Sequence, residues 1–549
     1  MKEQYLSLME KTLGAYSDAD IRDYFDTVKR EGLSEHGFPR LTANIGVLIA
    51  HGIRTDLYGI FLEMMDFCCE YIPRVDAANN FSVREILFAI DAVRDMVGME
   101  KVSRWHKSLS GIIPEECYVR IAKTEADRPH NFATFAALSE QVRIFFGISE
   151  RTDFVELQLA TQVPRLDGNG MYRDPHEPMV YDVVTRGLLS ELLYIGYRGK
   201  YYDIIDSALK RAGLMTLGMQ SVSGEIAYGG RSNSFLHNEA SLAIIFEYEA
   251  KRYIREGNIA LAEKFKTAAN AALANIDYWL DKKPITHIKN RFPRNSKYGC
   301  ESYAYFDKYM ITAASFLYVA YRMCDESVQP GSSQAAHPVA FSTSPDFHKT
   351  FLRAGEYFLE LDTAADKNYD SNGIGRVHKL GAPSSICISL PCAAQPHYTL
   401  DGESANISLC TGIISDNEEY FEADYAEYVG AFTSCDARSA MTTATVRYEN
   451  GASAALRVTL TADGLNVTSL AEKPLLMLPV FLFDGQEYSV ITHTENVLEI
   501  NYSGFVCRYT SSAKITETDR LGRNRNGYYK AYLTHGEGEI SVNVAIEKK

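Results

Sequence analysis

The spacing of hydrophobic residues changes part-way along the chain, and this change constrains the fold most. From the N-terminus to about Glu326, apolar residues recur every three or four positions in many segments, such as IGVLIAHGI, EILFAIDAVRDMV and YDVVTRGLLSELLYIGY. This spacing is typical of amphipathic helices. Short Gly, Pro, Asn or Asp stretches separate the segments, and they show no regular sequence period. We therefore expect antiparallel helix pairs that close into a toroid of about six hairpins, not a solenoid.

The second half has the spacing of strands. A stretch rich in Ser, Pro, Gly and Ala runs from Ser327 to Asp346, and one short helix is expected near Phe351 to Leu361. From about Gly375, alternating and β-branched runs are joined by NG, DG and GEG turns, which favour antiparallel hairpins. The sequence thus predicts a multidomain α-then-β protein: an (α/α) toroid over 1–326, a linker with a short helix over 327–364, and an antiparallel β-sandwich over 365–549.

Composition excludes several classes of function. The chain has 549 residues, of which 46% are hydrophobic and 23% charged, as in folded globular proteins of more than one domain. Its formal net charge of −15 argues against a general binder of nucleic acids or membrane surfaces, because phosphate groups need a basic face. An anionic substrate would therefore need a local basic pocket.

The termini, apolar runs and cysteines indicate the expected compartment. The start, MKEQYLSLMEKTLGAY, lacks the apolar core of a secretory signal, and no apolar run is long enough to span a membrane. The ten cysteines have no CxxC pair and no metal-ligand spacing. We expect a cytoplasmic protein with reduced thiols, no metal and no cofactor. Sandwich faces and toroid rims could pair into a homo-oligomer, which the sequence does not decide.

Polar residues gather in five clusters, and the first two lie in loops of the first half. Arg128, His130 and Asn131 precede an apolar segment, where they could bind substrate or simply cap a helix. The loop over 167–182 is dense in ionisable and phenolic groups, which favours a site because functional groups concentrate on loops held by rigid scaffolds. Its candidate residues are Tyr172, Asp174, Tyr181 and Asp182.

A third loop, over 225–239, contains two glycines and an arginine. Gly229 and Gly230 let the backbone approach a ligand closely, and Arg231 offers a planar fork that suits a carboxylate. The segment also contains Asn233, His237 and Glu239, which favours a site, although an acid in the first turn is also typical of a helix N-terminus.

Two further clusters follow along the chain. The stretch over 287–309 begins basic and ends rich in tyrosine, and Tyr303 and Tyr305 could provide stacking surfaces for sugar rings or serve as core residues. The fifth cluster, over 375–385, contains His378 at the start of the β half, where a lone histidine is more often structural.

The order of these motifs resembles that of the heparinase II/III-like and oligoalginate lyase families. Asn131 stands where those families have an Asn-rich element before a helix, and Asp167-Gly168 with Tyr172 and Tyr181 matches their Asp-Gly loop and Tyr-containing helix. Val377 to Gly381 corresponds to their His-x-His-x-Asp-like segment but keeps a single histidine. The resemblance implies a helical toroid, an antiparallel β-domain and a site in the cleft between them. Arg173-Asp174-Pro175 replaces the families' Glu-Gly, and the reduced histidine segment removes the ligands that bind zinc in some members.

The candidate residues are sufficient for β-elimination on a uronic acid. A lyase removes the proton at C5 and expels the oxygen at C4, so it must neutralise the carboxylate and supply a base and an acid. We expect Asn131 and Arg231 to bind the carboxylate, Tyr181 to act as the acid or as both acid and base, and His237 or His378 to act as the base. His130, Tyr172, Asn233, Tyr303 and Tyr305 are the further expected substrate contacts.

Two alternatives remain open at this stage. A glycoside hydrolase, such as an exo-acting glucuronidase or an unsaturated uronate hydrolase, needs two carboxyl groups. The same loops offer Asp174, Asp182, Glu225, Glu239 and Glu301. A glycan-binding protein without catalysis would need aromatic surface but no convergence of ionisable groups. The substrate in each case is an oligosaccharide, and for the two enzymes an anionic one.

Overall fold

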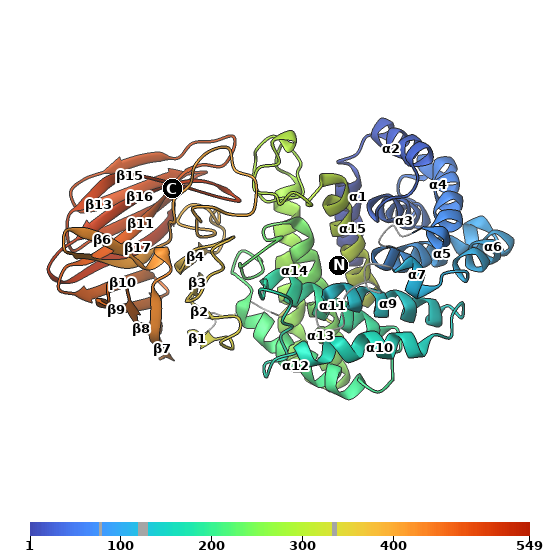
Figure 1. The fold of residues 1–549 in the computed structure, drawn as a ribbon, viewed down its shortest axis with the longest axis horizontal. Coiled ribbons are helices and arrows are strands. Elements are labelled where there is room, and N and C mark those ends of the chain that lie inside the picture. The colour runs from blue at the N-terminus through green and yellow to red at the C-terminus, as the bar shows by residue number, and fades with distance from the viewer. Residues whose placement is uncertain (76–78, 119–129, 332–336) are drawn as a thin grey trace.

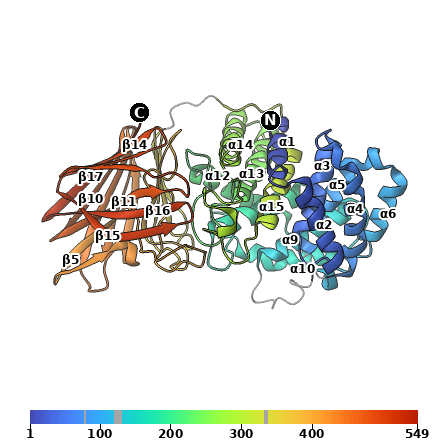
Figure 2. The ribbon, with the colours of Figure 1, turned by 90° about the horizontal axis from the view of Figure 1, so that it is seen from above.

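The molecule has a helical half and a β half that lie side by side (Figure 1). The computed structural model describes residues 1–75, 79–118, 130–331 and 337–549. Seen from above, the sheets occupy one end and the helices the other (Figure 2). The α-then-β order predicted from the hydrophobic spacing is therefore confirmed.

The described helices of the first half range from one turn to six. They are α1 (Lys2–Leu13), α2 (Asp18–Glu31), α3 (Gly37–Ala50), α4 (Tyr58–Tyr71), α5 (Val83–Val97), α6 (Met99–Leu109), α7 (Pro114–Cys117), α9 (Asn131–Phe145), α10 (Thr152–Gln162), α11 (Met179–Tyr194), α12 (Tyr202–Met219), α13 (Leu236–Arg255), α14 (Ile259–Leu280) and α15 (Phe306–Met323). Within the described ranges, no helix combines the length and the apolar character that crossing a bilayer requires.

The helices close into a ring. Six of them form an inner circle in which each contacts the next and the last contacts the first: α3, α5, α9, α11, α13 and α15. An outer helix packs on each of these, namely α4, α6, α10, α12, α14 and α1 in the same order. Inner helices such as α11 and α13 are buried along most of their length, because neighbours surround them on several sides. This arrangement is the (α/α) toroid that the sequence predicts.

The β half consists of three antiparallel sheets. Its strands are β1 (Val339–Ser342), β2 (Lys349–Ala354), β3 (Tyr357–Asp362), β4 (Gly373–Lys379), β5 (Cys410–Ser415), β6 (Glu418–Phe421), β7 (Glu427–Cys435), β8 (Ser439–Arg447), β9 (Ser453–Thr461), β10 (Gly464–Ala471), β11 (Pro474–Phe483), β12 (Val490–His493), β13 (Val497–Tyr502), β14 (Phe505–Ser511), β15 (Ile515–Asn524), β16 (Gly527–His535) and β17 (Gly538–Lys548). The sheets have the orders β1-β2-β3-β4, β12-β13-β14-β17-β10-β9-β8-β7 and β15-β16-β11-β5-β6.

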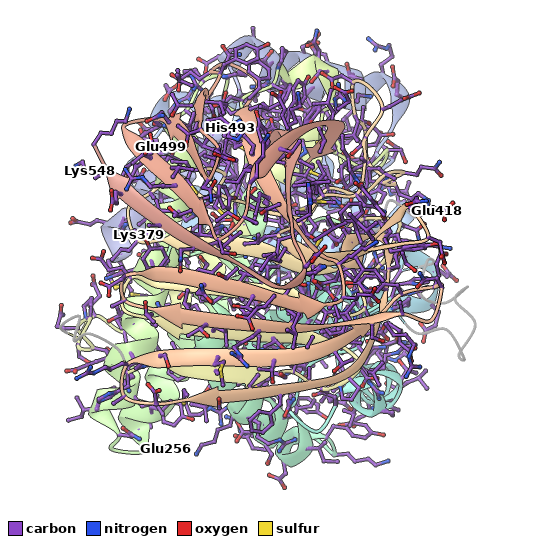
Figure 3. All side chains as sticks on the ribbon, turned by 90° about the vertical axis from the view of Figure 1, so that its left-hand side faces the viewer. Glu256, Lys379, Glu418, His493, Glu499 and Lys548 are labelled. Carbon is purple, nitrogen blue, oxygen red and sulfur yellow. The ribbon has the colours of Figure 1, made fainter. Side chains whose placement is uncertain are left out.

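The eight-stranded and five-stranded sheets form the predicted sandwich. Residues that alternate along their strands share one core, for example Val458 of β9, Val467 of β10 and Leu476 of β11. Figure 3 looks onto the eight-stranded sheet and labels Glu499 of β13 and Lys548 of β17. The outward positions of β8 and β9 are mostly polar or small, as expected of a sheet with one face in solvent.

The four-stranded sheet corrects one prediction. The segment near Phe351 to Leu361 is not a helix, because it forms strands β2 and β3 joined at Gly355, whose φ is +55°. Phe351 and Phe358 pack on the helical half, whereas Leu352 and Leu359 pack into the sandwich core. Both faces of these strands are therefore buried, and the apolar residues occur at consecutive positions without the alternation that identifies a strand.

Candidate functional site

The polar loops noted in the sequence lie at one end of the toroid. They lead into the N-termini of inner helices, at Asn131 for α9, Met179 for α11, Leu236 for α13 and Phe306 for α15. Inner helices of an (α/α) toroid run in the same direction, so these N-termini share one end of the ring, and their dipoles favour negative charge there. Segments of the β half contact the same loops, for example where the Gly230 amide donates to Asp370.

Arg231 is held in place by the loops of α9 and α11. Its guanidinium forms an ion pair with the buried carboxylate of Asp174 and donates to the carbonyl of Pro175 at 2.7 Å. Asp174 also accepts from the backbone and the side-chain amide of Asn131, at 3.0 and 3.2 Å. Burial disfavours the charged form of Arg231. The charge of Asp174 and the neighbouring tyrosines favour that form more strongly, so the pKa of Arg231 is raised. Arg231 is thus a fixed cation, and 21% of its side chain remains exposed.

The backbone around Arg231 has an unusual conformation. Gly230 and Ser232 have φ values of +75° and +60°, in the left-handed region. A Cβ on Gly230 would lie 2.7 Å from the Cβ of Pro178, so a side chain cannot fit there without displacing the loop that precedes α11. This close approach brings Arg231 over α11.

Tyrosine hydroxyls surround the arginine. The guanidinium of Arg231 lies 4.6 Å from the ring centroid of Tyr181, in the first turn of α11. The hydroxyl of Ser232 bonds the hydroxyl of Tyr181 at 3.1 Å and that of Tyr303 at 2.9 Å. Burial raises the pKa of Tyr303, although 37% of this residue is exposed. The cation and the two phenols therefore form one connected group that is open to solvent.

His237 lies behind this group. Its ring centroid is 5.4 Å from that of Tyr309, and Phe235 and Phe316 pack on its other sides. Burial raises the pKa of Tyr309, and a hydrogen bond with Tyr181 adds to this effect. Burial lowers the pKa of His237 to about 3, so its ring is neutral, and its Nδ1 has no hydrogen-bond partner among the described residues.

Two other candidate residues, Glu239 and His378, belong to a different cluster. The carboxylate of Glu239 lies 2.5 Å from Nζ of Lys289 and accepts from the backbone amide of Ile226. Nδ1 of His378 lies 2.6 Å from the hydroxyl of Ser221, and burial lowers the pKa of this histidine to about 3. The two halves are joined at this point by a buried ionic network, whose members are Glu225, Glu239, Lys289, Arg376 and His378.

The remaining predicted residues are placed in different surroundings. Tyr172 is fully buried and its hydroxyl bonds Gln162 at 2.6 Å, and Asn233 is also buried. His130 is half-buried, and burial lowers its pKa. The charges of Asp174 and Arg231 also act on this pKa, which shows that His130 lies near the arginine. Tyr305 is 53% exposed, with Nζ of Lys297 and of Lys308 at 5.7 and 5.4 Å from its ring centroid. Arg128 lies outside the described residues.

The five carboxylates that the sequence offers for hydrolysis are all buried and paired. Asp174 pairs with Arg231, Asp182 with Arg186, and Glu301 with Arg525. Glu239 pairs with Lys289, and Glu225 lies 3.8 Å from Lys289 and 3.7 Å from Arg376. None of the five therefore faces the open side of Arg231 as an unpaired acid or base.

Several residues around the arginine were not predicted. Ser232 lay inside a cluster noted in the sequence, but no sequence pattern indicated its left-handed backbone conformation. Tyr369 and Asp370 follow strand β3 in a loop rich in Asp and Asn, a composition typical of both turns and sites. Arg525 lies in the Asn-Arg-Asn-Gly turn between β15 and β16, a segment that was not among the clusters noted in the sequence.

Known proteins offer only distant comparisons. No family model and no curated protein matches the chain. Among solved structures, it is similar to a heparan sulfate lyase from Pedobacter heparinus, at 11% identity over 85% of this chain and 77% of that chain, with a TM-score of 0.39. A chondroitinase AC lyase matches at 9% identity over 99% and 82%, with a TM-score of 0.41. A glycosyl hydrolase family 88 protein from Bacteroides vulgatus matches at 12% identity over 59% and 99%, with a TM-score of 0.36. Because these scores are low, the likeness carries no conclusion about function.

Proposed function

We propose that this protein is a carbohydrate-active enzyme that cleaves uronic-acid-containing oligosaccharides by β-elimination. The observation that carries the proposal is the contact between Arg231 and Tyr181, in which a fixed guanidinium lies over the phenol that could transfer the proton. Ser232 connects this phenol to the solvent-exposed Tyr303. A cation for the carboxylate and a phenol for the proton are the two requirements of elimination at a uronate.

Each residue in the group has a chemical task in this proposal. Asp174 and Pro175 engage two of the five N–H groups of the Arg231 guanidinium, and the N–H at Nε is among the three that remain to donate to the substrate carboxylate. Its charge stabilises the enolate-like carboxylate that forms when the C5 proton leaves. In its phenolate form Tyr181 removes that proton, and the phenol so formed then donates it to the departing C4 oxygen, so a single residue acts as base and acid. Asn131 acts through Asp174, which it orients against the arginine.

The aromatic residues at the opening support a sugar substrate. Tyr303 and the exposed Tyr305 offer ring faces on which a pyranose can stack. Lys297 and Lys308 flank Tyr305 and favour an anionic chain on a protein whose net charge is negative. Neutral His237 supports the wall behind Tyr181 through Tyr309, where burial disfavours its protonation.

A glycoside hydrolase is the second candidate, and one observation favours it. Asp370 contributes a buried carboxyl beside Gly230, and burial raises its pKa to about 6, which suits a general acid. The pairing of the other five carboxylates counts against this alternative, because hydrolysis needs a second carboxyl free to activate water or attack.

Cleavage of uronate oligosaccharides tests the proposal directly. Elimination creates a conjugated C4–C5 double bond, so ultraviolet absorbance should rise as new chain ends appear. Tyr181→Phe should abolish that rise, whereas Tyr194→Phe, which removes a hydroxyl bonded to the Arg322 carbonyl at the other end of the same helix, should not. Release of reducing sugar without absorbance would overturn elimination in favour of hydrolysis.

A further inference from the structure

Two carboxylates accept hydrogen bonds from the backbone of the loop that contains Arg231, one on each side of the arginine. The backbone amide of Gly230 donates to Oδ2 of Asp370 at 2.8 Å, and the backbone amide of Ser232 donates to Oε1 of Glu301 at 2.6 Å. Both carboxylates are buried, where a hydrogen bond to a charged acceptor is stronger than one at the surface. The conformation of three consecutive residues is thus fixed at both ends.

Both attachments lead to the β half. Asp370 belongs to the loop between β3 and β4. Glu301 belongs to the helical half, but Arg525 of the β15–β16 turn holds it by two bonds, at 2.6 and 3.0 Å, and also donates to the carbonyl of Gly299 at 2.7 Å. The guanidinium of Arg525 lies 4.2 Å from the ring centroid of Tyr398, which covers it from the β side.

We propose that Asp370 and Arg525 are positioning residues through which the β half completes the site on the toroid. This inference rests on the proposed function, in which Arg231 binds the substrate carboxylate and Tyr181 transfers the proton. Asp370 acts on Gly230, next to the arginine. Arg525 acts through Glu301 on Ser232, whose hydroxyl contacts both Tyr181 and Tyr303.

The two attachments should affect different kinetic constants. Loss of the Asp370 contact loosens the backbone beside Arg231, so it should weaken substrate binding and raise KM. Loss of Arg525 frees Glu301, which holds the backbone amide of Ser232, so the Ser232 hydroxyl should shift, disturb Tyr181 and lower kcat. A purely structural role would not separate KM from kcat in this way, since partial unfolding lowers only the amount of active enzyme.

Steady-state kinetics of matched variants test the separation. Asp370→Ala should raise KM by about tenfold with little change in kcat, and Asp370→Asn, which keeps an acceptor oxygen, should restore most of the affinity. Arg525→Gln should lower kcat by about tenfold with little change in KM. Arg508→Gln is the matched control, because this arginine forms a more exposed ion pair with Glu499 elsewhere in the β half. Equal behaviour of Arg525→Gln and Arg508→Gln would overturn the inference.

Hydrogen exchange separates failure of this inference from failure of the proposed function. In the unmodified protein, the amides of Gly230 and Ser232 should exchange slowly. Asp370→Ala should accelerate exchange at Gly230, and Glu301→Gln, an isosteric change that leaves Arg525 without its anionic partner, should accelerate exchange at Ser232. Both results need no substrate, so they stand even if uronates are not cleaved. Unchanged exchange at both amides would overturn the positioning role whatever the activity.

Discussion

Two clusters of this protein contain the same kinds of residue and yet differ in what they can do. The group around Arg231 combines an arginine, a carboxylate, a serine and tyrosines, and it leaves Arg231 and Tyr303 partly exposed. The ionic network around Lys289 and Arg376 combines cations, carboxylates, a serine and a histidine, and its charged groups are all buried. A loop dense in ionisable residues therefore marks either a site or a contact between domains, and exposure distinguishes the two.

The physical cost of burial explains why the charges of the network are paired with one another. A buried charge must be paired, so each carboxylate of the network lies close to Lys289 or Arg376. Its histidine stays neutral because burial lowers the pKa of His378. Arg231, in contrast, pairs with the buried Asp174 and still leaves 21% of its side chain exposed.

The largest expected effect comes from Tyr181. Tyr181→Phe removes the hydroxyl to which we assign proton transfer, and general acid–base groups contribute about a hundred- to ten-thousand-fold to rate, so kcat should fall by that factor. The melting temperature should stay close to that of the unmodified protein, because the ring remains in place. Measurement of kcat and of thermal unfolding on the same sample checks both halves. A small loss of kcat would contradict the proposal that the Arg231 group, unlike the ionic network, takes part in catalysis.

Lys289→Met should lower stability and leave kcat unchanged, which is the opposite of the result expected for Tyr181→Phe. This change leaves Glu239 buried beside no cation, and breaking a buried pair costs about 3–5 kcal/mol of unfolding free energy. The kcat of the remaining folded protein should be unchanged. Lys210→Met is the control, because its ion pair with Glu256 is solvent-exposed and should contribute less than about 1 kcal/mol. Denaturant unfolding measures both, and equal losses would contradict the assigned burial.

His378 should give the network a pH signature. Its pKa is about 3 in the folded protein, so the unfolded chain binds a proton near its ordinary pKa of about 6.5 and the folded chain does not. Stability associated with this histidine is therefore lost as pH falls from about 6.5 towards 3, by up to about 1.4 kcal/mol per pH unit. Relative to the unmodified protein, His378→Asn should gain stability across this window. A pH-independent difference between the two unfolding curves would refute the neutral buried ring.

The smallest expected effect concerns Asp370. Burial raises its pKa to about 6, with Lys349, Arg525 and the Gly230 amide opposing that rise and Asp362 adding to it. As pH falls through about 6 the carboxylate takes up a proton, and the Gly230 amide loses its charged acceptor. KM should then rise a few-fold below about pH 6, whereas Asp370→Asn should show a flat profile. A rise of equal size in both proteins would assign the titration to another group.

The fold could be predicted from the sequence where an element buries only one face, or where a long helix is buried on all sides. Helical spacing identified the toroid, and alternation with NG and DG turns identified the sandwich. Strands β2 and β3 were mistaken for a helix because both of their faces are covered, by helices on one side and by the sandwich core on the other. Short apolar runs without alternation carry no strand signal.

The site could be predicted only where its residues lie in loops that are themselves unusual. Arg231 and Tyr181 became candidates because their loops are dense in polar groups. The sequence could not indicate that Tyr172 is enclosed beside Gln162, since exposure depends on the packing of several helices. Asp370 and Arg525 lie more than a hundred residues from Arg231 along the chain, and only the docking of the two halves brings them to its loop.

The mass of the products formed from a uronate oligosaccharide tests the central claim most directly. If the Arg231 group carries out β-elimination, the new non-reducing fragment will be lighter by one water than the corresponding hydrolysis product, and Tyr181→Phe will form none of it. Fragments that have all gained a water, formed equally well by Tyr181→Phe, would contradict the account.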